Sequence, residues 1–231
     1  MILNIYGPSN SGKTQLAEKL VAALREKDYS VGTVKNIHVE GFTIDTEGKD
    51  TWRHHEAGAE MVVANSEDEV AFLVKYGMVP EEVKYVIYKA TDPDILIVEG
   101  HWDDESPKIL VGEMEERPNT QMIYSDNFDD ILNYAVEGIE TEKIMEELPG
   151  LDCGKCGNDT CRELAEAIRQ EKNTFEDCEY FSEKKVSMIV DGKEIPLGKF
   201  AKDIVAGTIS GMVSTLKGVE GGREIKVEIR G

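Results

Sequence analysis

Residues 7–14 carry the most recognisable chemistry in this chain. They read Gly-Pro-Ser-Asn-Ser-Gly-Lys-Thr and follow directly on the apolar run 2–6. This is the G-x-x-x-x-G-K-[ST] pattern of a phosphate-binding loop, in which backbone N–H groups and the start of a helix attract anionic oxygens. The pattern therefore predicts a nucleoside triphosphate site built by the loop residues Gly7, Pro8, Ser9, Asn10, Ser11, Gly12, Lys13 and Thr14.

Three side chains are expected to carry most of the chemistry at this site. Lys13 would contact the β- and γ-phosphates, and the Thr14 hydroxyl would bind Mg²⁺. Glu99 ends the apolar run 95–98, where phosphate-loop proteins often place a carboxylate that holds Mg²⁺. The alternative for Glu99 is that it caps the strand or pairs with a neighbouring arginine.

A polar segment, residues 36–59, lies between the apolar runs 31–35 and 61–64, which we expect to be strands. Together with Lys35 just before it, this segment supplies further candidate site residues. Lys35 and Arg53 could neutralise phosphate, and Asp50 could bind Mg²⁺ or orient a water, because ligands of α/β sheets bind beyond the carboxyl ends of the strands. The alternative for each of these residues is an ordinary surface ion pair.

The four cysteines form a second constellation, Cys153-x2-Cys156-x4-Cys161-x16-Cys178. Clustered thiols in a reducing compartment indicate a metal centre rather than disulfides. Zinc ribbons usually carry two matching cysteine pairs, whereas this asymmetric spacing suits the separate corners of a [4Fe-4S] cubane. We predict an iron–sulfur centre bound by all four thiolates; zinc and merely structural thiols are the alternatives.

The elements that position these residues follow from hydrophobic patterning. Strand-like runs at 2–6, 31–35, 61–64, 95–98 and 108–111 alternate with helical stretches, which predicts an α/β domain with a mostly parallel sheet. Residues 15–26 are expected to form the helix after the loop.

Three domains are predicted along the chain. Pro149 and Gly150 end a helix over 141–148, which sets a nucleotide-binding domain at 1–148 and a [4Fe-4S] domain at 149–182. Residues 183–231 read as a ββαβ segment, with a hairpin over 186–197, a helix over 199–217 that Gly218 caps, and a strand over 224–229. Gly207 and Gly211 on that helix are expected to mark close packing on the hairpin.

Composition excludes some classes of function. The net charge is −20, from 46 acidic and 26 basic residues, which disfavours binding to nucleic acid or to an anionic membrane. No apolar run reaches the roughly 20 residues of a membrane-spanning helix. We therefore expect a cytoplasmic protein.

The first half of the chain resembles the MobB family, the GTP-binding accessory proteins of molybdopterin-guanine dinucleotide biosynthesis. The resemblance rests on the segments 7–14, 31–35, 48–59 and 94–100, and covers about residues 1–148. It implies a homodimer that binds GTP and Mg²⁺, hydrolyses GTP weakly at most, and assists a MobA-like molybdopterin guanylyltransferase or a molybdo- or tungsto-enzyme.

The same resemblance assigns roles to individual residues. Gly12, Lys13 and Thr14 would bind phosphate and Mg²⁺, and Lys35 and Arg53 would line the site. Lys13, Asp50 and Glu99 are then the catalytic candidates. GTP rather than ATP is implied by the resemblance alone, because the chain has no Asn-Lys-x-Asp element.

Residues 150–178 resemble the single-cluster [4Fe-4S] domain of RnfB and of corrinoid iron–sulfur proteins. A nucleotide-dependent electron-transfer ATPase and a ferredoxin-like redox module therefore stand as alternative functions. Nitrogenase-like reductases carry an extra lysine five residues before the loop lysine, where this chain has Pro8, and this weakens the ATPase alternative.

Overall fold

The computed structural model describes residues 1–181, 186, 188–190, 193–195, 197 and 199–216. The chain divides into two compact units, Met1–Ala135 and Val136–Gly231. The division falls inside helix α4 (Phe128–Glu147), earlier than the boundary after residue 148 suggested by the sequence.

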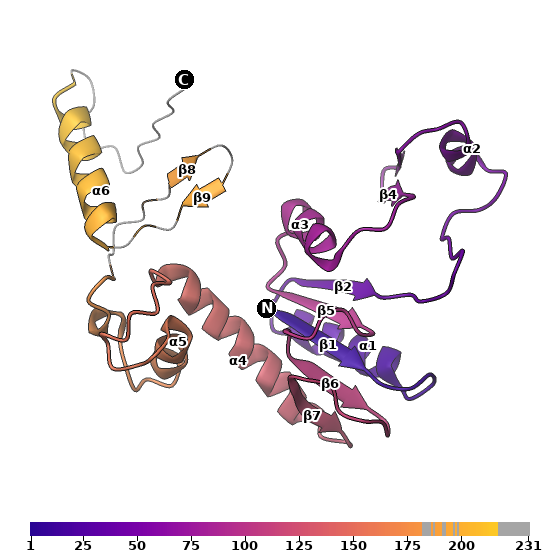
Figure 1. Cartoon of the computed structure of the whole chain (residues 1–231), viewed down its shortest axis with the longest axis horizontal. Coiled ribbons are helices and arrows are strands. Elements are labelled where there is room, and N and C mark those ends of the chain that lie inside the picture. Colours follow the sequence, from indigo (N-terminus) through magenta and orange to yellow (C-terminus); the bar gives the residue numbers. More distant parts are fainter. Residues whose placement is uncertain (182–185, 187, 191–192, 196, 198, 217–231) are drawn as a thin grey trace. The chain divides into compact units, whose positions relative to one another are not determined.

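A five-stranded parallel sheet forms the centre of the first unit (Figure 1). Its spatial order is β2-β5-β1-β6-β7, with β1 in the middle. Leu3, Ile5, Leu96 and Val98 are fully buried, as expected of central parallel strands that read as continuous apolar runs. The predicted α/β class is thus confirmed. The strand bounds are β1 (Ile2–Tyr6), β2 (Val31–Lys35), β5 (Ile95–Glu99), β6 (Lys108–Val111) and β7 (Thr120–Tyr124).

Helix α1 (Lys13–Glu26) packs on this sheet and starts at the phosphate loop. Its leucines recur at intervals of four, which places Leu16, Leu20 and Leu24 on one buried face. The helix predicted over 15–26 is therefore confirmed, and it begins two residues earlier, at Lys13 itself.

The expectation that residues 61–64 join the parallel sheet is wrong. β3 (Met61–Asn65) pairs antiparallel with β4 (Val70–Val74) in a separate two-stranded sheet. The physical reason is the short turn between them, where the Ser66 N–H donates to the Glu69 carbonyl. A turn of this length lets the chain pair only with the strand that precedes it, and only antiparallel.

Two further helices belong to the first unit. α2 (Asp50–Glu56) contacts β3, and α3 (Pro80–Ala90) connects β4 to β5. In Figure 1, the chain leaves the end of β2, forms α2 at a distance from the five-stranded sheet, and returns through β3 and β4. We call residues 36–74 the arm.

The second unit has a small core around helix α5 (Cys161–Arg169). Leu148, Cys161, Leu164, Ala165 and Cys178 form a buried cluster there. The short 3₁₀ helix η1 (Phe175–Asp177) leads to the last cysteine. The rings of Phe175 and Phe181 stack, with their centroids 4.8 Å apart. Leu164 and Ala165 of α5 are fully buried in this core.

The C-terminal elements match the sequence in part. β8 (Met188–Val190) and β9 (Lys193–Ile195) pair antiparallel, and α6 (Lys199–Ser214) follows. The predicted cap at Gly218 and strand over 224–229 lie outside the described residues. An added Cβ on Gly207 or Gly211 would meet no described atom within 4 Å, so the described residues do not bear out close packing there. Every described helix is too short or too polar to cross a lipid bilayer.

Candidate functional site

The phosphate loop connects β1 to α1 with the backbone conformation that anion binding requires. Asn10 and Gly12 have φ angles of 62° and 98°, and such left-handed residues turn successive N–H groups toward one side. Among the described residues, no side chain caps the N-terminus of α1, which leaves the helix dipole open to an anion. The Lys13 ammonium donates to the Gly7 carbonyl at 3.1 Å and also to the Pro8 carbonyl. The loop therefore fits a phosphate chain.

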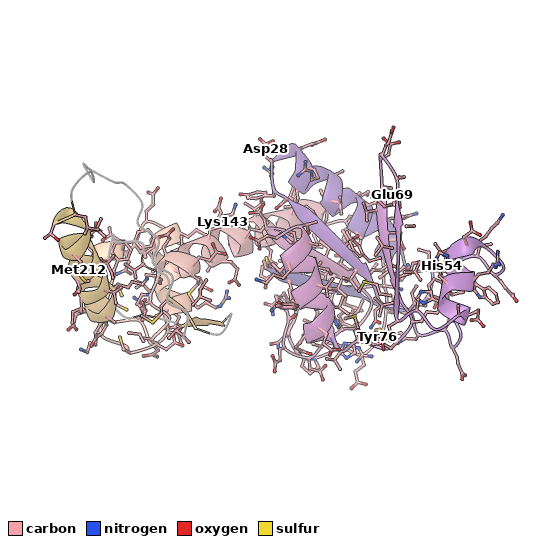
Figure 2. All side chains as sticks on the ribbon, turned by 90° about the horizontal axis from the view of Figure 1, so that it is seen from above. Asp28, His54, Glu69, Tyr76, Lys143 and Met212 are labelled. Carbon is pink, nitrogen blue, oxygen red and sulfur yellow. The ribbon has the colours of Figure 1, made fainter. Side chains whose placement is uncertain are left out.

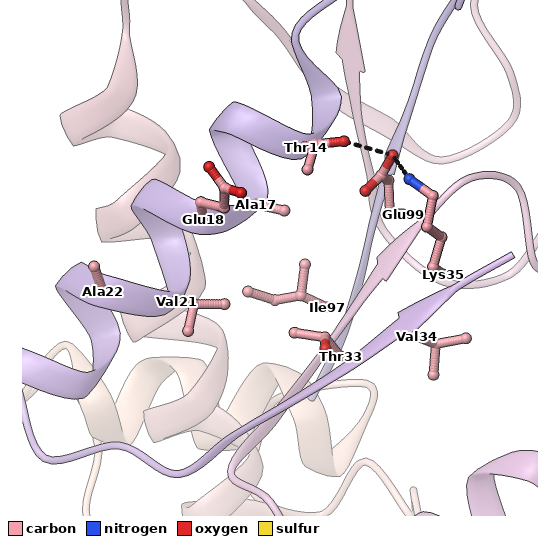
Figure 3. Close-up of a pocket in the computed structure, with 10 residues that line it drawn as sticks. All are labelled: Thr14, Ala17, Glu18, Val21, Ala22, Thr33, Val34, Lys35, Ile97 and Glu99. Atoms are coloured by element: carbon pink, nitrogen blue, oxygen red, sulfur yellow. Dashed lines mark hydrogen bonds and ion pairs between the residues drawn. The ribbon is translucent and has the colours of Figure 1, made fainter. Parts of the chain in front are cut away.

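Glu99 joins three elements at the end of the sheet. Its Oε1 atom accepts hydrogen bonds from the Thr14 hydroxyl at 2.9 Å and from the Lys35 ammonium at 2.5 Å (Figure 3). Lys35 and Glu99 are register partners on β2 and β5, so strand pairing itself brings them together. Hydroxyl and carboxylate oxygens are the ligands that Mg²⁺ prefers, and the donor set of Thr14 and Glu99 therefore fits this ion.

The same contacts set the charge of Glu99. Burial acts to raise the pKa of this carboxyl, but hydrogen bonds from Lys35 and Thr14 and the charges of Lys35 and Lys13 outweigh burial and lower the pKa below its ordinary value. Glu99 is consequently ionised at neutral pH and is a weak base.

These side chains surround a pocket of about 600 Å³, lined by residues 9–15, Lys35 and Glu99. A second hollow of about 370 Å³ adjoins it and shares Thr14, Lys35 and Glu99 with it. Ala17 and Val21 of α1 face Thr33 and Ile97 of the sheet across this apolar hollow (Figure 3). The polar pocket has the size and lining expected of a site for charged phosphates.

The structure places the two remaining predicted site residues elsewhere. Asp50 and Arg53 lie on α2, where their side chains are 90% and 70% exposed and pair with each other at 3.9 Å. Neither lines a described pocket that contains the phosphate loop. His54 marks the position of this helix, away from the five-stranded sheet (Figure 2). The structure thus brings Lys13, Thr14, Lys35 and Glu99 together, but not Asp50 and Arg53.

Two residues at the site were not predicted. Gln15 lines the polar pocket, and Gly112, just after β6, packs so closely on the loop that an added Cβ would lie 3.0 Å from the Ser11 Cβ. The helical register after Lys13 could have indicated Gln15. No local pattern indicates Gly112, because its contact depends on the neighbouring position of β1 and β6 in the sheet.

Three of the four cysteines share one environment. Cys161 and Cys178 are buried in the core of the second unit, and Cys156 packs against it, whereas Cys153 is exposed. Burial raises the pKa of the Cys178 thiol, and the nearby thiols of Cys161 and Cys156 raise it further. Neutral thiols suit this buried position, and thiolates would need compensating positive charge from a bound metal centre.

The loop before α5 also fits a cluster. Gly154 and Gly157 have φ angles of 70° and 86°, and an added Cβ on either would meet no described atom within 4 Å. Within the described residues, no three Cys, His, Asp or Glu side chains are arranged to hold one metal ion. A cubane is held differently, since each thiolate binds a separate iron corner.

Two protein families match successive parts of this chain. Residues 2–136 match the family described as "Molybdopterin guanine dinucleotide synthesis protein B" (MobB), and residues 148–180 match the family described as "Putative Fe-S cluster". A Methanocaldococcus jannaschii protein named "Putative molybdopterin-guanine dinucleotide biosynthesis adapter protein" is 30% identical over 242 residues, which cover 99% of this chain and 97% of that protein.

Two shorter likenesses concern the first unit. The molybdopterin-guanine dinucleotide biosynthesis adapter protein of Haemophilus influenzae is 34% identical over 116 residues, which cover 49% of this chain and 64% of that protein. The crystal structure of a MobB homologue from Bacillus stearothermophilus covers 61% of this chain and 98% of its own, with 18% identity and a TM-score of 0.44. With a family match over more than half of its length and a relative similar along nearly all of it, the chain belongs to the MobB family and carries an iron–sulfur cluster domain after its nucleotide-binding domain.

Proposed function

We propose that this protein is a GTP-binding accessory factor of molybdenum or tungsten cofactor biosynthesis that assists guanylyl transfer to molybdopterin. The observation that carries the proposal is the contact of Thr14 and Lys35 with one oxygen of Glu99 beside an open phosphate loop, in a chain whose relatives are named for this pathway. The choice of GTP over ATP rests on the family.

Each residue of the pocket has a distinct proposed role. The backbone N–H groups of residues 9–13 and the Lys13 ammonium bind the phosphates, and Lys35 adds a second positive charge. Thr14 and Glu99 hold Mg²⁺, which supplies charge neutralisation for the β- and γ-phosphates when bound. Asp50 and Arg53 remain predicted site residues, and on α2 they are accessible to a second molecule.

The pocket suits binding better than hydrolysis. Glu99 is the one carboxylate among its described lining residues, and the lowered pKa makes it a poor acceptor for a proton from water. A nucleotide can therefore act as a signal that changes how the factor meets its partner, with weak GTPase activity at most.

For the second domain we propose a [4Fe-4S] cluster bound by Cys153, Cys156, Cys161 and Cys178. Such a cluster takes up and releases one electron, and it also links chain segments that share few other contacts. The buried thiols of Cys161 and Cys178 support a structural contribution, and the exposed loop around Cys153 leaves room for electron exchange with a partner.

We further propose that the protein is a cytoplasmic homodimer and that its partner is a MobA-like guanylyltransferase or a molybdo- or tungsto-enzyme. The two-stranded sheet of the arm supports association, because Met61, Val63 and Phe72 are 54%, 45% and 63% exposed on it. Isolated two-stranded sheets are marginal in water, and burial of this face would stabilise the arm.

A nucleotide-dependent pull-down tests the proposed function. The full chain is purified without oxygen and presented to extract in the presence of GTP, GDP, ATP or no nucleotide. GTP-dependent capture of a molybdopterin guanylyltransferase, or of a molybdo- or tungsto-enzyme, is expected, and Lys13→Ala should abolish it. Lys19→Ala, on the exposed side of the same helix, is the matched control and should capture the partner normally.

Two results would count against the proposal. Capture of redox proteins alone, unaffected by nucleotide, would support the ferredoxin-like alternative, and a partner captured equally with ATP would contradict the GTP assignment. Iron and sulfide analysis of the same sample tests the cluster, and zinc without iron would contradict it.

A further inference from the structure

Lys155 lies between the first two cysteines and contacts the residues just after the last one. Its Nζ atom is 3.3 Å from the Glu179 carboxylate and 4.6 Å from the centre of the Tyr180 ring, and it also donates to the Tyr180 hydroxyl. Glu179 and Tyr180 follow Cys178 directly in the sequence. One side chain therefore connects the loop that carries Cys153 and Cys156 to the segment that carries Cys178.

The other cations of this domain are engaged away from the cysteine loop. Arg162 pairs with Glu142, Arg169 pairs with Glu137 at 3.2 Å, and Lys172 donates to Gln170. Lys155 is thus the one basic residue of the described loop 153–161, which carries the first three cysteines. Its charge is balanced by the Glu179 carboxylate.

Tyr180 connects this contact to the protein interior. Tyr180 and Phe181 pack against the buried cluster that contains Cys161 and Cys178, and so does Cys156. The Phe181 N–H donates to the Cys178 carbonyl at 3.0 Å, and the Gly157 N–H donates to the Gly154 carbonyl at 3.1 Å. Both turns that flank the Lys155 contact are therefore ordered by their own backbone hydrogen bonds.

We propose that Lys155 is a positioning residue for the iron–sulfur centre: it clamps the Cys153–Cys156 loop to the Cys178 segment and keeps a positive charge beside the thiolates. This inference rests on the cluster assignment made above. It has two consequences. The clamp holds the ligands close together in the cluster-free chain, and its charge favours the reduced cluster, which is one charge more negative.

The experiment uses the full chain and four variants. Lys155→Met keeps the length of the side chain but removes its charge and hydrogen bonds, whereas Lys155→Arg keeps the charge. Tyr180→Phe keeps the ring and removes the hydroxyl. Lys172→Met is the matched control, since it removes an exposed lysine of the same domain whose ammonium donates to Gln170.

Three properties are measured: iron loss and midpoint potential in the cluster-loaded chain, and hydrogen exchange in the cluster-free chain. For the cluster-loaded chain, we expect Lys155→Met to lose iron to a chelator about tenfold faster, as outer ligand-shell changes do, and to show a more negative midpoint potential. Lys155→Arg should restore most of the iron retention and of the potential. Tyr180→Phe should lose iron at an intermediate rate, and its potential should stay close to that of the wild type because the charge of Lys155 remains. For the cluster-free chain, hydrogen exchange at residues 153–157 and 178–181 should be several-fold faster in Lys155→Met than in Lys172→Met.

The outcomes separate this inference from the proposed function. If Lys155→Met matches Lys172→Met in iron loss, potential and exchange, the clamp is wrong. If the wild-type chain binds no iron, the cluster assignment fails, and exchange in the cluster-free chain still decides whether Lys155 clamps the two segments.

Discussion

The two candidate sites differ in how much of their geometry the main chain supplies. In the first unit, strand register places Lys35 opposite Glu99, and the phosphate loop follows directly from the central strand. In the second unit, Cys161 and Cys178 are buried, but Cys153 is exposed on a loop that the Lys155 side chain joins to Glu179. A site at the edge of a sheet is formed before its ligand binds, whereas a cysteine loop depends on its ligand and on contacts such as that of Lys155.

The largest effect is expected when the substitution Gly7→Ala adds a methyl group at the phosphate loop. Gly7 has a φ of 152°, and an added Cβ would lie 2.0 Å from the Val111 carbonyl oxygen. Because that oxygen belongs to a buried strand, Gly7→Ala should destabilise the first unit by roughly 2–4 kcal/mol and abolish GTP binding. Urea unfolding and nucleotide titration measure the two effects. Stability and affinity like those of the wild type would show that the loop is not fixed by the sheet.

The next largest effect concerns charge rather than shape. Glu99→Gln keeps the size of the side chain but replaces an ionised acceptor, so Mg²⁺-dependent affinity for GTP should fall by about tenfold to a hundredfold. Iron content should not change. Isothermal titration with and without Mg²⁺ measures the loss, and Glu18→Gln, at the adjoining hollow, is the control. An equal loss without Mg²⁺ would contradict the metal-binding role.

Local patterns predicted the elements that have a distinctive run or motif of their own in the sequence. Three such elements are the apolar run 95–98, the loop 7–14 and the helix that contains the leucines of α1. The structure has a strand at the first, a loop with left-handed residues at the second, and a helix at the third. β7 was missed because its side chains alternate between half-buried and exposed and include Thr120 and Gln121. Such a strand is specified by its pairing with β6, which is a non-local contact.

Residue chemistry also misleads where tertiary contacts override it. Lys108 is fully buried in the sheet, and its ammonium donates to the Ser106 carbonyl at 2.7 Å, although lysine in a sequence indicates exposure. Asp50 and Arg53 were placed at the nucleotide by motif, but the path of the arm after β2 decides where they lie. The Lys155 contact escaped prediction because its partners are more than twenty residues away in the sequence.

Substitution of Gly154, a glycine of the cysteine loop, is the matched comparison to the substitution of Gly7. Gly154 has a φ of 70°, but an added Cβ would meet nothing described within 4 Å. Gly154→Ala should therefore cost only the strain of a left-handed residue, about 1–2 kcal/mol, and Gly154→Asn should cost less because asparagine tolerates this conformation. Iron loss to a chelator measures both variants. A loss of all iron in Gly154→Asn would show that the loop is as tightly constrained as the phosphate loop.

The smallest expected effect is a salt-dependent change in a carboxyl pKa. It should occur in the first unit and not in the second, because different contacts lower the pKa in each. In the first unit, hydrogen bonds from Lys35 and Thr14 and the charges of Lys35 and Lys13 lower the pKa of Glu99 below its ordinary value. In the second, the Thr174 N–H and the Asn173 amide lower the pKa of Asp177 below 3.8. Added salt screens exposed charges but not backbone hydrogen bonds. Carboxyl NMR titrations in about 0.05 M and 1 M NaCl should therefore show the pKa of Glu99 rising toward 4.5 while that of Asp177 stays constant.

The sign of the accompanying stability change follows from linkage. A carboxyl with a lowered folded-state pKa stabilises the fold above its ordinary pKa, and this contribution is lost as the pH falls through the folded value. For Glu99 the loss begins near pH 4.5 on acidification and should be smaller in high salt, because the folded and unfolded pKa values then lie closer together. Lys35→Met should remove most of this salt dependence. If added salt raised the pKa of Asp177 as much as that of Glu99, nearby charges would lower the carboxyl pKa in both units. The two sites would then not differ in their electrostatics.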